Sequence, residues 1–131
     1  MRKIKVDKIT YYFYTPKLNI EIKDANIISN GNSSIVVCDA QNSKKVKSRL
    51  PEVLGESVRI TDYSKETLSE IMNKYSSKIK KIENINNYQF LLCYDDSLPK
   101  FVLVDEQKIN LQIAITDSEI DVGYPLILNG Y

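Results

Sequence analysis

Apolar and polar residues alternate with a period of two along much of the chain, and two segments depart from this pattern with helical spacing. The clearer of the two runs from residue 64 to residue 82, and Ser64 is expected to cap its N-terminus. Its apolar residues fall on one helical face: Leu68, Ile71, Met72, Tyr75, Ile79 and Ile82. Acidic residues lie early and lysines late, which suits the helix dipole. The sequence therefore predicts an amphipathic helix over 64–82.

A second helix is predicted over 43–54, with Asn42 and Ser43 as capping residues and apolar residues at 46, 50, 53 and 54. Pro51 conflicts with a helix interior because it lacks a backbone N–H. The helix is therefore expected to kink there, or to restart with Pro51 in its first turn. Gly55 is expected to end it.

The remaining apolar positions predict β-strands and turns. Strands are expected at residues 3–15 (one or two), 19–23, 34–38, 57–61, 88–94, 101–104, 109–116 and 120–128. Asn30-Gly31-Asn32 predicts a hairpin turn, 95–99 a loop and 105–107 a further turn. These elements indicate a single α+β domain over 1–131, with antiparallel sheet packed against two helices. The strand–helix–strand order occurs twice, at roughly 34–61 and 57–95, so a weak internal repeat of about 1–56 and 57–131 is one interpretation.

Composition restricts the chemistry more than it identifies it. The chain of 131 residues contains no histidine, which removes the commonest general base and the commonest metal ligand. A Ser–His or Cys–His nucleophile pair is therefore excluded. The two cysteines, Cys38 and Cys93, either pair in an oxidising compartment or are small buried residues in strands, and we favour burial. We predict no catalytic residue, no metal site and no cofactor, and hence no enzyme.

Charge is distributed unevenly along the chain. Residues 1–59 carry 11 Lys and Arg against 6 Asp and Glu, a net charge of +5, whereas residues 60–131 carry 7 against 11, a net charge of −4. Two basic helix faces are predicted, and their residues are Lys44, Lys45, Lys47 and Arg49 in the first and Lys74, Lys78, Lys80 and Lys81 in the second. The first is the candidate binding surface, with phosphate contact and tyrosine stacking as the sharper interpretation. The alternative is two solvated faces whose lysine stems cover apolar surface.

Two acidic segments are candidate sites. Asp117, Glu119 and Asp121 are spaced two apart, as in a cation-binding loop, but Val122 stands where an EF-hand requires glycine. A charged hairpin turn is the favoured interpretation. Asp95-Asp96 is likewise expected to be a solvated turn rather than an acid–base pair.

Residues 108–115 (KINLQIAI), residues 122–127 (VGYPLI) and Tyr131 resemble the C-terminal end of the YwmB-like proteins of low-GC Gram-positive bacteria. The shared pattern is an Asn-Leu-Gln-x-Ala strand, then Gly-x-Pro-x-Ile, then Tyr. It assigns Asn110, Gln112, Gly123 and Pro125 a structural role. The resemblance implies a TATA-box-binding-like fold with curved antiparallel sheets. It supplies no catalytic residues, and members of the family are usually exported or membrane-anchored.

Three functions follow as expectations. The first is a non-enzymatic binding or accessory domain of the cell envelope or of sporulation, whose partner is another protein. The second is a nucleic-acid or nucleoprotein binder, and the third is a small inhibitor or immunity protein of a mobile element. No apolar stretch reaches the roughly 18 residues of a membrane span. The first seven residues lack the apolar region of a signal peptide, which indicates a cytoplasmic protein, or an extracytoplasmic one whose signal has been removed.

Overall fold

The computed structural model describes residues 8–125, which form ten strands and two α-helices. The first half contains β1 (Lys8–Pro16), β2 (Asn26–Asn30), β3 (Ser33–Asp39), α1 (Ser43–Ser48) and β4 (Gly55–Thr61). The second half contains α2 (Lys65–Tyr75), β5 (Ile79–Ile85), β6 (Tyr88–Cys93), β7 (Val102–Val104), β8 (Gln107–Ile109), β9 (Leu111–Ile115) and β10 (Glu119–Tyr124). The α+β class and the large antiparallel sheet are confirmed.

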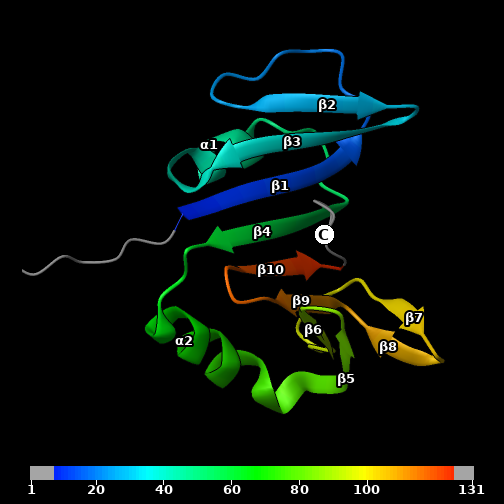
Figure 1. Cartoon of the computed structure of the whole chain (residues 1–131). Helices are drawn as coiled ribbons and strands as arrows, with labels where there is room; N and C mark the ends of the chain where they lie inside the picture. Colours follow the sequence, from blue (N-terminus) through cyan, green and yellow to red (C-terminus); the bar gives the residue numbers. More distant parts are fainter. Residues whose placement is uncertain (1–7, 126–131) are drawn as a thin grey trace, which may run out of the picture.

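Eight strands form one antiparallel sheet in the order β2-β3-β1-β4-β10-β9-β6-β5, and β7 and β8 form a separate hairpin (Figure 1). The two halves of the chain meet where β4 pairs with β10. The strand–helix–strand units differ in topology, because one strand separates β3 from β4 whereas three separate β4 from β5.

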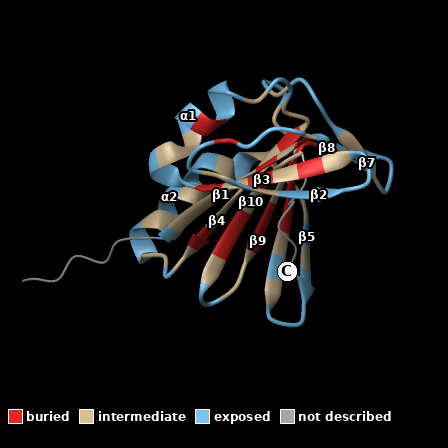
Figure 2. Cartoon of the chain, turned by 90° about the horizontal axis from the view of Figure 1, so that it is seen from above, coloured by how far each residue is buried: buried red, intermediate tan, exposed pale blue. Residues whose placement is uncertain are grey.

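Both helices cover the same face of the sheet (Figure 2). Directly opposed residues of antiparallel strands share a face, so the register identifies the rows of side chains that cross the sheet. The row under the helices is Cys38, Tyr11, Val58, Val122, Ile113 and Leu91. The neighbouring row on the helix-free face is Val37, Tyr12, Ser57, Gly123, Gln112 and Leu92.

The core under the helices consists of two separate clusters. Under α1, Phe13, Val36 and Val46 are the most deeply buried members. Under α2, the buried members come from the sheet: Ile60, Leu91, Cys93, Leu111, Ile113 and Ile120. Cys38 lies in the first cluster and Cys93 in the second, and both are free and buried. Burial raises the pKa of the Cys93 thiol to about 11, which makes it a poor nucleophile at neutral pH.

Two helical predictions were too long. The helix predicted over 43–54 ends at Ser48, and Gly55 begins β4 instead of ending a helix. The residue before a proline avoids helical conformation, which explains why the chain leaves the helix ahead of Pro51. The helix predicted over 64–82 is capped by Ser64, whose Oγ accepts a hydrogen bond from the Thr67 N–H at 3.2 Å. It ends at Tyr75.

The end of α2 changes the placement of the residues that follow. A short 3-10 turn at 76–78 leads into β5, so Ile79 and Ile82 belong to a strand and not to the helix face. The second predicted basic helix face is wrong for the same reason, because only Lys74 remains on α2, while Lys80 and Lys81 lie in β5.

Two strand predictions also require correction. The strand predicted over 19–23 is an irregular loop in which Ile22 is buried, and the paired strand is β2 at 26–30. The strand predicted over 109–116 is interrupted, because Asn110 separates β8 from β9. The hairpin turn at Gly31 is confirmed, with a positive φ of 62°. Predictions on residues 3–7, Leu126, Leu128 and Tyr131 lie outside the described residues.

Candidate functional site

The helix-covered face holds a cavity beside the C-terminal end of α2. α1 packs on the core cluster of the first half of the chain, and α2 packs on that of the second. The cavity has a volume of about 410 Å³, which is within the range typical of ligand pockets. We term it the helix-side cleft, and its lining residues are Tyr11, Glu56, Val58, Lys74, Tyr75, Asp95, Ser97, Leu98, Leu111, Val122 and Tyr124.

The floor of the helix-side cleft is apolar and its walls are aromatic. Val58 and Val122 are paired neighbours on β4 and β10, and both point to the helix side. Tyr11 comes from β1, Tyr75 from the end of α2 and Tyr124 from the end of β10. The Tyr124 hydroxyl accepts a hydrogen bond from the backbone N–H of Lys100 at 3.3 Å.

Both carboxylates of the cleft are paired with lysines. Glu56 lies 3.1 Å from Lys47 of α1, and Asp95 lies 2.7 Å from Lys78. Asp95 also accepts hydrogen bonds from the Ser97 hydroxyl and N–H, at 2.6 and 3.0 Å. The Lys78 ammonium and these Ser97 donors lower the pKa of Asp95 to about 2. Such a carboxylate stays ionised and is a weak general base near neutral pH, so the arrangement favours binding over catalysis.

Of the basic residues predicted around α1, Lys47 is the one that an ion pair links to the cleft. Lys44, Lys45, Lys47 and Arg49 are all exposed, and the Lys47–Glu56 ion pair links α1 to the cleft wall. Among residues 8–125, no ion pair involves Lys44, Lys45 or Arg49. The sequence identified this basic surface but gave no indication of the cleft beside it.

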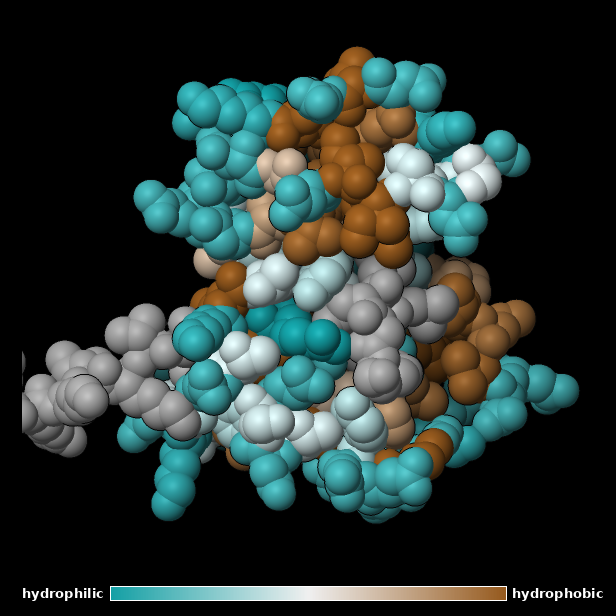
Figure 3. Space-filling model, turned by 45° about the horizontal axis from the view of Figure 1, so that its top comes forward, coloured by the Kyte–Doolittle hydropathy of each residue, from teal (hydrophilic) through white to brown (hydrophobic). Residues whose placement is uncertain are grey.

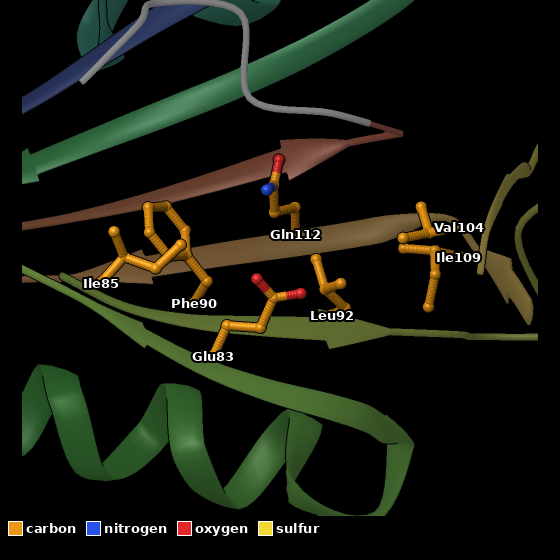
Figure 4. A pocket seen from close by; sticks show the side chains of 7 residues that line it. All are labelled: Glu83, Ile85, Phe90, Leu92, Val104, Ile109 and Gln112. Carbon is orange, nitrogen blue, oxygen red and sulfur yellow. The ribbon is translucent and has the colours of Figure 1, made fainter.

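A second cavity of about 270 Å³ lies on the helix-free face of the sheet, over β5, β6 and β9 (Figure 4). We term it the hairpin cavity, and its lining residues are Glu83, Ile85, Phe90, Leu92, Val104, Ile109 and Gln112. Five of them are apolar, and Val104 and Ile109 belong to the β7–β8 hairpin. Figure 3 shows apolar side chains gathered beside this hairpin and, separately, over the β2–β3 end of the sheet.

The four residues assigned a structural role by the family resemblance are only partly brought together. Gly123 and Gln112 are directly paired on the helix-free face. Asn110 is fully buried, and its side chain bonds both the N–H and the carbonyl of Asp95, at 2.8 and 2.7 Å. Pro125 follows β10 and lies against Gly55, where a Cβ would come 3.2 Å from the proline Cδ.

The predicted acidic segments have structural partners. Asp121 is fully buried and its Oδ1 lies 2.9 Å from Nε of Arg59, which also approaches Glu119 at 3.4 Å. This ion pair links β10 to β4 across the junction of the two halves. Residues 8–125 contain no cluster of three or more His, Cys, Asp or Glu arranged to hold a metal ion. Asp117 and Ser118 form the exposed turn before β10.

Sequence reasoning missed the three tyrosines of the helix-side cleft as a group. The sequence predicts Tyr11 in the strands over 3–15, Tyr75 on the apolar face of a helix and Tyr124 in the family-like segment, but no local pattern places them together. They converge only because β1, β10 and the end of α2 are neighbours in three dimensions.

Comparison with family models, curated proteins and solved structures found no match. No helix within the described residues has the length and apolar character needed to cross a membrane.

Proposed function

We propose that this protein is a non-enzymatic binding module whose helix-side cleft receives a segment of another protein. The observation that carries the proposal is the cleft itself, in which three tyrosines surround an apolar floor. Tyrosine is enriched in protein-binding surfaces because it supplies a large contact area and a polar hydroxyl with few rotatable bonds. An aromatic or branched aliphatic side chain of the partner would fill this floor.

The charge around the cleft determines which residues are favoured on either side of the anchoring side chain in the bound segment. Lys47 and Lys78 neutralise the two lining carboxylates, while Lys74 adds a positive charge at the wall and lies 5.2 Å from the Tyr75 ring centroid. Lys44 and Lys45 of α1, and Arg49 directly after it, add further exposed positive charges. Asp96 adds one exposed negative charge near Lys78. The net surplus is positive, so acidic residues beside the anchoring side chain would be favoured.

Peptide titrations test this proposal. The first probe is a short peptide with a central phenylalanine flanked by glutamates. The second has alanine in place of the phenylalanine, and the third has lysines in place of the glutamates. We expect the first to bind most tightly, with NMR shift changes at Tyr11, Tyr75 and Tyr124. Equal binding of all three, or shift changes confined to the helix-free face, would contradict the proposal.

A variant that fills the cleft, compared with a control variant elsewhere, also tests the proposal. Val122→Trp places a large side chain on the cleft floor, and Leu103→Trp adds the same side chain to the exposed face of β7. Peptide binding should be lost in Val122→Trp and retained in Leu103→Trp. Circular dichroism and urea denaturation establish that both variants fold. Retention of binding in a folded Val122→Trp variant would refute the cleft as the site.

Nucleic-acid binding through α1 is the second candidate, because Lys44, Lys45 and Arg49 are exposed beside Lys47. A DNA and an RNA oligonucleotide are therefore titrated at low salt, where phosphate contacts are strongest. Oligonucleotide binding that survives Val122→Trp and disappears in Lys44→Ala/Lys45→Ala would replace the protein-binding proposal.

We further propose that the chain is a YwmB-like protein of a spore-forming Gram-positive bacterium, with a TATA-box-binding-like fold and a role in the envelope or in sporulation. The residue pattern at 108–127 supports this assignment. Gene neighbourhood tests it: a cell-wall or sporulation operon is expected, and a toxin or phage operon would instead favour an inhibitor or immunity protein.

A further inference from the structure

The hairpin cavity is walled by an excursion of the chain that leaves the large sheet after β6 and returns at β9. Within this excursion β7 and β8 pair only with each other, in the register Val102–Ile109, Leu103–Lys108 and Val104–Gln107. Val104 and Ile109 line the cavity, whereas Leu103 is 67% exposed on the opposite side of the hairpin. The hairpin therefore has an inner face directed at the cavity and an outer face in solvent.

Polar contacts at its base and its tip hold the hairpin over the cavity. At the base, the Asn110 side chain joins the two ends of the excursion through its bonds to the Asp95 backbone. At the tip, Asp105 lies 2.7 Å from Lys81 of β5. The cavity between these contacts is thus a built feature of the fold, since its walls are fixed from both sides.

The cavity has room for one small organic molecule. Its volume of about 270 Å³ exceeds the roughly 150 Å³ of an apolar protein cavity that binds benzene. Ile85, Phe90 and Leu92 form the sheet side, and Val104 and Ile109 form the hairpin side (Figure 4). An aromatic or branched aliphatic group fits these walls.

The charged groups at the cavity give it a negative surplus. Glu83 is the only ionisable residue among its lining side chains, and its Oε1 lies 3.3 Å from Nζ of Lys81. Lys81 also forms an ion pair with Asp105, so two carboxylates share one ammonium group. A second cation at Glu83 would complete the neutralisation, whereas an anion would face a net negative charge.

We infer that the hairpin cavity binds a small apolar amine, a site separate from the helix-side cleft. The apolar group of the ligand packs among Phe90, Leu92 and Ile109. Its ammonium group lies at the mouth and donates a hydrogen bond to the Glu83 carboxylate, which Lys81 neutralises only in part. A charge-assisted bond of this kind selects the amine over a neutral or acidic compound with the same apolar group.

Three probes that share one phenyl group test the inference: 2-phenylethylamine, 2-phenylethanol and phenylacetate. Each is titrated into the full chain and followed by NMR. We expect saturable binding with shift changes at Phe90, Leu92 and Ile109. The affinity order should be amine, alcohol, acid, with about tenfold between the first and the last.

Variants separate the two parts of the site. Glu83→Gln should lower the affinity for the amine to that for the alcohol, while the alcohol is little affected. Glu66→Gln, at an exposed position on α2, is the matched control and should change neither. Val104→Trp fills the cavity from the hairpin side and should abolish binding of all three probes.

The inference is overturned by equal affinities of the three probes, by an unchanged amine preference in Glu83→Gln, or by an absence of saturable binding. Shift changes at Tyr11, Tyr75 and Tyr124 instead of Phe90 would also overturn it, since they would place the amine in the helix-side cleft.

Discussion

The helix-side cleft and the hairpin cavity lie on opposite faces of the large sheet, share only β9, and are lined by different kinds of side chain. Adjacent residues of β9 contribute to each, because Leu111 lines the cleft and Gln112 lines the cavity. Successive side chains of a strand point to opposite faces, so β9 contributes a different residue to each site. The cleft is walled by tyrosines and ion pairs, whereas the cavity is walled mainly by aliphatic side chains.

The two sites also differ in what closes them. Regular elements of the large sheet and α2 wall the cleft, together with the loop after β6, but the cavity depends on a hairpin outside that sheet. Both sites depend on Asn110. It holds Asp95, which lines the cleft, and it fixes the base of the hairpin. A substitution in one site is therefore expected to leave the other site unchanged, except at Asn110, where both should be affected.

The largest effect is expected for Asn110→Ala. Asn110 is fully buried, and its removal leaves the N–H and carbonyl of Asp95 without those partners. Unsatisfied buried polar groups are costly, so the free energy of unfolding should fall by about 3 kcal/mol. Urea denaturation measures this, with Asn87→Ala in the exposed turn before β6 as the control. A loss no larger than that of the control would show that the two sites do not share this support.

Sequence patterns foresaw this architecture unevenly, and Asn110 illustrates why. Asn110 lies within the strand predicted over 109–116, but it interrupts that strand and is fully buried. The start of α2 was predicted correctly because a capping serine is a local signal. Its end was not, because Ile79 and Ile82 satisfy helical spacing and β-propensity equally well. Local residues cannot decide between the two, whereas pairing of β5 with β6 does.

Filling the sites one at a time is expected to have the next largest effect. Val122→Trp should weaken peptide binding at the cleft by more than about tenfold, because an overfilled floor excludes the partner side chain. The same variant should leave phenylethylamine binding unchanged, since Val122 points away from the hairpin cavity. Val104→Trp should give the reverse pattern. Isothermal titration of both probes against both variants measures this, and parallel losses would show that the sites are coupled.

Acid should distinguish Asp95 of the cleft from Asp105 of the hairpin tip. The pKa of both carboxyls is lowered, Asp95 by Lys78 and Ser97 to about 2, and Asp105 by Lys81. A carboxyl with a lowered pKa in the folded protein adds stability above its ordinary value of 3.8, and that contribution is lost as the pH falls through the folded-state value. Asp95→Asn should therefore flatten the loss of stability between pH 3.8 and about 2.

Asp105→Asn should have a smaller effect on the loss of stability in acid. Asp105 is largely exposed, whereas the Asp95 side chain is 13% exposed. Urea midpoints measured across this pH range for the two variants and the parent chain provide the comparison. An equal or larger effect at Asp105 would mean that the hairpin tip is held more firmly than the cleft wall.

The smallest effect is expected for Lys81→Gln, and its sign is the informative part. Lys81 is shared between Glu83 and Asp105, so it competes with a ligand ammonium for Glu83. Its removal should strengthen phenylethylamine binding by roughly threefold, in keeping with the modest energies of exposed ion pairs. Peptide binding at the cleft should not change. Lys80→Gln is the control, because Lys80 is the exposed neighbour of Lys81 in β5 and has no ion pair among the described residues.

Weaker amine binding in Lys81→Gln would carry a different meaning. It would show that the ion pair to Asp105 matters more for holding the hairpin over the cavity than for competing with the ligand. Asp105→Asn should weaken amine binding under either contribution, because it removes the hairpin contact and leaves Lys81 to neutralise Glu83 alone. The sign of the Lys81→Gln effect therefore separates the two contributions. Stronger binding in Lys81→Gln together with weaker binding in Asp105→Asn would identify Glu83 as the group that the ligand and Lys81 share.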